Sequence, residues 1–144
     1  MPDELLRPTI GAGVDISVRP WRLMSQAYVA FFGGVIASTA VAFLNSRRLG
    51  VDAAKRRLIL LTGIVGLIAV VALFVLLDGE SLQVSSRVVA VLCFLLQLRL
   101  QRPMDRAFQL RGTDYGSLWV IGIGLTIGGA VTEALILLLV TVIR

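Results

Sequence analysis

Residues 117–143 read SLWVIGIGLTIGGAVTEALILLLVTVI and carry a single charged side chain, Glu133. A helix of about 20 mostly apolar residues is long enough to cross the hydrocarbon core of a bilayer. The apolar residues are continuous and do not alternate with polar ones, which favours a helix over a strand of a membrane barrel. This stretch therefore predicts a transmembrane helix.

Three further apolar runs precede it, at about residues 23–44, 58–77 and 82–98. The chain has 144 residues, of which 57% are hydrophobic and 16% are charged. A soluble domain averages about 45–50% apolar and about 25% charged residues. The sequence therefore predicts an all-α fold, an integral membrane four-helix bundle, in which residues 1–144 form one domain and residues 1–22 form an outer tail.

The residue types exclude many kinds of site. The sequence contains no His and one Cys, Cys93, so haem, zinc and iron–sulfur centres lack the ligands that they need. It also contains no P-loop, GxSxG, HExxH or CxxC motif. We expect no enzymatic activity, no cofactor and no metal, and the basic loops are too short to indicate binding of nucleic acid.

Basic residues gather in the first and third loops between the predicted spans. The first loop contains Arg47, Arg48, Lys55, Arg56 and Arg57. Loops rich in Lys and Arg stay in the cytoplasm, which predicts that both of these loops lie inside and both termini outside. The same five residues also offer a site for anionic lipid headgroups, worth about 1 kcal/mol each.

A short helix is expected between the third and fourth spans. Met104, Ala107 and Phe108 follow Pro103 at positions i, i+3 and i+4, so they share one helical face. The pattern predicts an interfacial amphipathic helix, whose apolar face rests on lipid or docks on a partner.

Glu133 is the strongest single signal, because a charge in the middle of a span costs roughly 2.5–3.5 kcal/mol on insertion scales. Gly122, Thr126, Gly129 and Glu133 share one helical face. Arg87 in the third span is the natural partner for an intramembrane charge pair with Glu133. A bond to a partner subunit and a role in a proton or ion relay are the alternatives.

Small residues also line the first span. Gly33, Gly34 and Ser38 belong to a wide face of this kind, and Gly124 and Gly128 repeat the spacing in the last span. Small residues let helices approach closely. Two such faces exceed the need of a minimal bundle, which predicts a helix of another membrane subunit as a partner.

Residues 30–50 read AFFGGVIASTAVAFLNSRRLG, and residues 116–125 read GSLWVIGIGL. The chain resembles uncharacterised small bacterial inner-membrane proteins with four spans, whose first span bears glycines and ends in N-x-R-R-L-G and whose last span is Trp-led and glycine-rich. The resemblance implies a bundle in the bacterial cytoplasmic membrane and implies no catalytic residue.

Together these patterns predict a non-catalytic accessory subunit that stabilises a larger complex of the cytoplasmic membrane, for instance a multi-subunit lipid transporter. Its partners would be other integral membrane subunits and membrane lipids. The alternative is a small homo-oligomeric carrier or channel that uses Glu133 and Arg87.

Overall fold

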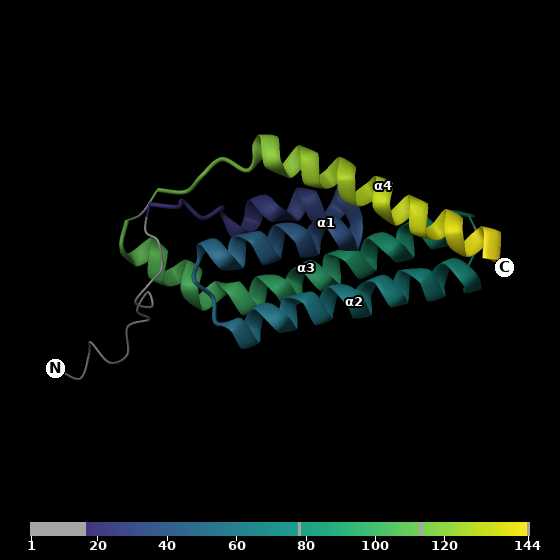
Figure 1. Ribbon diagram of the computed structural model, residues 1–144, viewed down its shortest axis with the longest axis horizontal. Coiled ribbons are helices and arrows are strands. Elements are labelled where there is room, and N and C mark those ends of the chain that lie inside the picture. Colours follow the sequence, from purple (N-terminus) through teal and green to yellow (C-terminus); the bar gives the residue numbers. More distant parts are fainter. Residues whose placement is uncertain (1–16, 78, 113, 144) are drawn as a thin grey trace.

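The computed structural model describes residues 17–77, 79–112 and 114–143. It is all-helical (Figure 1), with a short 3-10 helix, η2 (Leu23–Gln26), followed by α1 (Ala27–Arg48), α2 (Ala53–Leu76), α3 (Gly79–Leu110) and α4 (Trp119–Ile143). Four segments are long and apolar enough to cross a membrane, because η2 and α1 together count as one of them. The prediction of a helical, multi-pass membrane protein is therefore confirmed at this level.

The first of these segments folds back on itself. Gly34 interrupts α1 with φ 78° and ψ −166°. The amide of Trp21 donates to Oδ1 of Asn45 at 2.7 Å, and Nδ2 of Asn45 donates to the Trp21 carbonyl at 3.2 Å. A continuous helix would hold residues 24 positions apart about 36 Å from each other. Residues 23–33 and 35–48 are therefore the two arms of a helical hairpin with Gly33 and Gly34 at its tip (Figure 1).

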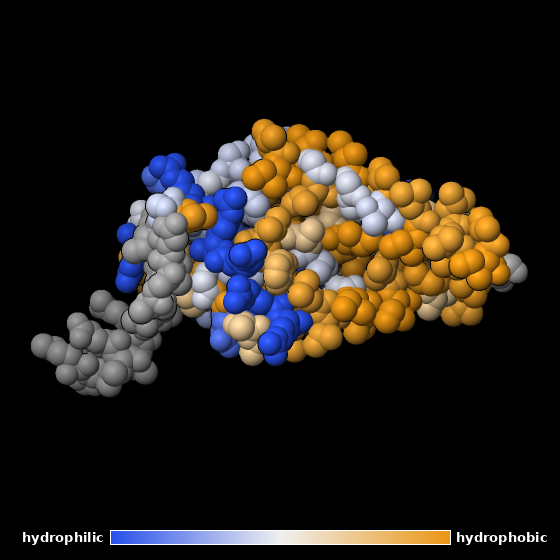
Figure 2. Space-filling model, in the orientation of Figure 1, coloured by the Kyte–Doolittle hydropathy of each residue, from blue (hydrophilic) through white to orange (hydrophobic). Residues whose placement is uncertain are grey.

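The hairpin corrects the expected course of residues 23–44, because its two arms begin and end at the same end of the bundle. We call this end, where residues 17–22 meet the α1–α2 connection and the last turns of α3, the basic end. The opposite end, with the α2–α3 connection, is called the far end. On the face that Figure 2 shows, hydrophilic surface is concentrated at the basic end, whereas the far end is mostly apolar.

Residues 17–22 lie at the same end of the bundle as the first loop, whereas the sequence predicted them on opposite sides of the membrane. Nη1 of Arg48 donates to the Arg19 carbonyl at 3.0 Å, and its guanidinium lies 4.0 Å from the ring centroid of Trp21. The hydropathy and length of a segment do not show whether it forms one straight helix or two antiparallel arms. The sequence therefore did not predict the hairpin. The rest of the expected outer tail, residues 1–16, lies outside the described residues.

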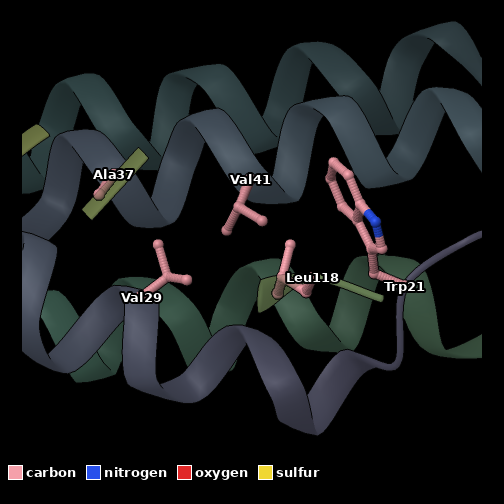
Figure 3. Close-up of a cluster of buried hydrophobic side chains, with 5 residues drawn as sticks. All are labelled: Trp21, Val29, Ala37, Val41 and Leu118. Carbon is pink, nitrogen blue, oxygen red and sulfur yellow. The ribbon is translucent and has the colours of Figure 1, made fainter. Parts of the chain in front are cut away.

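The two arms pack face to face around one apolar cluster. Trp21 and Val29 come from the first arm and the segment before it, while Ala37 and Val41 come from the second arm; Leu118, just before α4, completes the cluster (Figure 3). All five side chains are buried. This contact between neighbouring arms holds the hairpin closed and places its tip against α3 and α4.

The expected interfacial helix is not a separate element. Residues 104–110 are the last turns of α3, which continues through Pro103. Ala107 and Phe108 are buried, and Phe108 packs with Leu23, Leu49 and Val51, with Met104 beside them. The apolar face therefore docks on the chain itself, because the fold-back brings η2 and the α1–α2 connection to it.

Tyr115, in the connection to α4, contacts the last turns of α3 through Asp105, so the pKa of its hydroxyl reports on this part of the fold. Its hydroxyl donates to Oδ1 of Asp105 at 2.8 Å, and Nε2 of Gln109 donates to the other oxygen at 3.1 Å. Burial, the hydrogen bond and the charge of Asp105 raise the pKa of Tyr115 from 10.0 to about 12. The interaction therefore stabilises the fold fully below pH 10, and its contribution is lost as the pH rises towards 12.

We expect an ultraviolet titration of the phenolate to show a tyrosine component with a midpoint near pH 12, which disappears in Tyr115→Phe. A midpoint near the ordinary value for this component would contradict the contact with Asp105.

Candidate functional site at the hairpin tip

The tip of the hairpin is where the intramembrane charges meet the backbone. Gly34 adopts a positive φ that residues with a Cβ rarely adopt. A Cβ on Gly33 would lie 2.9 Å from Cα of Thr126, so the backbones of α1 and α4 touch at this point. The break also leaves backbone donors and acceptors without helical partners.

Glu133 binds the start of the second arm. The amide of Val35, the first residue after the break, donates to Oε2 of Glu133 at 3.1 Å. The N-terminus of a helix carries a partial positive charge from the aligned peptide dipoles. A carboxylate from α4 therefore neutralises the donor end of the second arm and satisfies one of its free amides.

Arg87 binds the end of the first arm. Its Nη1 donates to the carbonyl of Phe31, and its guanidinium lies 6.0 Å from the centroid of the Phe31 ring. The C-terminus of a helix carries free carbonyls and a partial negative charge. One cation and one anion thus complement the two ends that the break creates.

The structure brings Arg87 and Glu133 to one hollow of about 170 Å³ at the tip. Each side chain nevertheless binds backbone of α1, and in the described part of the chain no hydrogen bond joins the two directly. The sequence predicted that Glu133 needs a partner inside the protein. The backbone of the broken helix α1 supplies one such partner, the amide of Val35.

The predicted packing residues meet other parts of the same chain. A Cβ on Gly129 would lie 2.8 Å from Cα of Ala37, and one on Gly122 would meet the Tyr28 ring. Oγ of Ser38 donates to Gln97 at 2.9 Å. Added Cβ atoms on Gly124 and Gly128 would meet nothing within 4 Å. The small-residue face of α4 that contacts the hairpin is therefore internal, while the second pair of glycines is open.

A column of buried amides escaped the sequence analysis. Nδ2 of Asn45 donates to Oε1 of Gln101 at 3.0 Å, and Nε2 of Gln97 donates to Thr39 at 2.9 Å. All three amide side chains are fully buried. The spacing of Gln97 and Gln101 by one helical turn was the signal that α3 presents a polar face to the second arm.

The five basic residues of the first loop lie at the basic end. Arg47, Lys55 and Arg57 are exposed, whereas Arg48 and Arg56 are partly buried. The exposed charges lie at the surface of the bundle.

The described residues offer little chemistry beyond these contacts. Residues 17–77, 79–112 and 114–143 contain no group of three His, Cys, Asp or Glu placed to hold a metal ion. Cys93 is buried and unbridged. No family model, curated protein or solved structure matches the chain. The function must therefore be argued from the geometry alone.

Proposed function

We propose that this protein is a non-catalytic subunit that stabilises a larger complex of the bacterial cytoplasmic membrane. The observation that carries the proposal is the use of Glu133 and Arg87 as caps of a broken helix. Intramembrane charges usually mark pathways or reaction sites. Here each one supports the shape of the hairpin, which favours a structural role.

The outer face of α4 supports docking on another membrane subunit. A Cβ added to Gly124 or Gly128 would meet nothing within 4 Å, and Thr132, one turn further along, donates to the Gly128 carbonyl of its own helix at 2.7 Å. Glycines at this spacing permit close contact between two membrane helices. The proposed partner is a transmembrane helix that packs along this face.

Replacing Gly128 by Leu tests the docking. We expect the wild-type protein, tagged and extracted from its native membrane in mild detergent, to carry its partner with it, and the variant to lose at least tenfold of that partner, measured by quantitative mass spectrometry. A bulky side chain forces the helices apart and removes packing energy, and about 1.4 kcal/mol suffices for a tenfold loss.

The control is Thr141→Leu, which adds bulk at another exposed position of α4. The proposal would be contradicted if no membrane protein co-purified with the wild-type chain, or if both variants recovered the partner equally.

We further propose that the basic end faces the cytoplasm. The basic residues of the α1–α2 connection and the end of α3 lie there with Arg19 and Arg22, which satisfies the positive-inside rule without conflict. The hairpin then enters and leaves the membrane from the cytoplasm, α2, α3 and α4 cross it, and the end of α4 lies outside. The exposed arginines would add weak attraction to anionic headgroups.

Cysteine accessibility checks this orientation. In a Cys93→Ser background, we expect Ser17→Cys and Asp52→Cys to resist a membrane-impermeant thiol reagent added to whole cells, whereas Ser81→Cys at the far end reacts. Reaction at residue 17 without reaction at residue 52 would show that the first segment crosses the membrane.

The homo-oligomeric carrier has less support, since both charges bind backbone. Reconstitution in liposomes separates the two functions. A substrate flux that Glu133→Gln abolishes would favour the carrier and count against the structural role.

A further inference from the structure

The hairpin leaves a gap in the half of the bundle nearest the far end. α3 and α4 each pack mainly against α1, and α1 turns back at Gly33 and Gly34. Beside this tip, a groove of about 630 Å³ runs along α3. Pockets of roughly 300–1,000 Å³ are typical of sites for small ligands.

The groove has an apolar wall and one polar end. The rings of Phe31 and Phe32, which pack edge to face with centroids 5.1 Å apart, form one side. Val84, Val88, Val91 and Leu92 of α3 form the other. Gln83 and Arg87 are the polar residues of its lining.

The order of these residues along α3 matches the order of groups in a lipid. α3 begins at the far end with Gly79, so Gln83 and Arg87 lie nearer the membrane surface there than Val91 and Leu92. Eight residues of helix separate Gln83 from Val91, which corresponds to about 12 Å. A headgroup at the polar end would therefore send its chain inward along the apolar wall.

Arg87 supplies a specific reason for an anionic ligand. A guanidinium has five N–H donors, and the hydrogen bond that the structure shows for this side chain goes to the Phe31 carbonyl. Donors that face hydrocarbon without a partner are costly, and Arg pairs well with the oxygens of a phosphate. Arg87 also lines the neighbouring hollow of about 170 Å³, which it shares with Glu133, whereas the described lining of this groove contains no carboxylate.

We propose that the groove binds one acyl chain of an anionic phospholipid from the leaflet at the far end, with the phosphate on Arg87 and Gln83. The phosphate satisfies the remaining donors of Arg87, and the chain covers Phe31, Phe32 and the valines of α3. The site makes the protein a holder of one particular lipid, which is a property separate from docking on a partner helix.

Photo-crosslinking of the full chain in maltoside micelles tests the site, because this detergent has no anionic headgroup to compete. The probes are phosphatidylglycerol and diacylglycerol that carry the same diazirine in the same chain. We expect phosphatidylglycerol to label residues 84–92 and the Phe31–Phe32 pair at least tenfold more than diacylglycerol, since a hydrogen bond to a charged group of this kind is worth about a tenfold preference or more.

Two sets of variants separate lipid binding in the groove from the structural contact that Arg87 makes with the Phe31 carbonyl. Val88→Trp fills the groove and touches no cap, so we expect it to abolish labelling, whereas Val120→Trp, which adds the same bulk to the lipid-facing side of α4, leaves labelling intact. Arg87→Lys should retain labelling within about threefold and Arg87→Gln should lose it, because lysine also binds phosphate through its charge, whereas glutamine carries none.

Equal labelling by diacylglycerol would overturn the proposal, as would undiminished labelling of Val88→Trp. Labelling by a diazirine palmitate in the absence of labelling by phosphatidylglycerol would overturn the assignment to a phospholipid. Loss of the partner in the pull-down with Gly128→Leu would leave this site unaffected, so the two proposals fail separately.

Discussion

Glu133→Ala is expected to lower the free energy of unfolding by about 3 kcal/mol. The substitution removes a charge-assisted hydrogen bond, worth about 1.5–3 kcal/mol, and leaves the amide of Val35 without its partner inside the bundle. Glu133→Gln keeps an acceptor oxygen and loses the charge, so we expect a loss of about 1 kcal/mol. Reversible unfolding in mixed micelles of SDS and maltoside measures both.

The matched control is Thr132→Ala on the same helix, whose hydroxyl donates to the carbonyl of Gly128 one turn earlier. We expect a change below about 0.5 kcal/mol there. If Glu133→Ala proved as stable as this control, the carboxylate would not cap the second arm.

Gly34→Ala is the second large effect. Its φ of 78° and ψ of −166° lie in a region that is essentially restricted to glycine, and a residue with a Cβ pays about 1–3 kcal/mol there. The added atom would also collide with the carboxylate of Glu133 and displace it from Val35. The two costs together predict a loss of about 3–4 kcal/mol in the same unfolding assay.

Gly128→Ala is the control, because its Cβ meets nothing within 4 Å. A helical Gly replaced by Ala gains about 0.5–1 kcal/mol. We also expect Gly34→Ala and Glu133→Ala to be non-additive, since both remove the same contact. Full additivity, or equal effects of the two glycine substitutions, would contradict a break that depends on Glu133.

The sequence predicted the helices well where apolar runs coincide with straight elements. The runs at 58–77 and 117–143 became α2 and α4 with ends that differ by a few residues. The run at 82–98 became only the middle of α3, because Gln101, Asp105 and Phe108 have buried contacts that let the helix continue. The hydropathy pattern predicted an earlier end for this helix, because polar residues such as Gln101 and Asp105 lower the mean hydropathy of the segment.

The hairpin course of the first segment could not be predicted from hydropathy. Nothing in the apolar content of residues 23–44 distinguishes a straight helix from two arms, because both arms are rich in apolar residues. The decisive contacts join Trp21 to Asn45 and Val35 to Glu133. These are tertiary contacts, and only the adjacent glycines at 33 and 34 gave a local hint.

The sequence did identify the two charges that matter and the face on which Glu133 lies. It could not assign their roles, because the free amide of Val35 and the free carbonyl of Phe31 exist only once the helix is broken. Each charged side chain binds a backbone group, and any residue type can supply such a group. The sequence therefore contains no complementary side chain that would identify the contact.

The cap of the hairpin comes from the last helix of the chain. Val35 and Glu133 are 98 positions apart, so a ribosome working at about 5–20 residues per second needs about 5–20 s to make the second after the first. During that interval the amide of Val35 lacks the acceptor that α4 later supplies. A chain that stops short of Glu133 would therefore leave the start of the second arm uncapped.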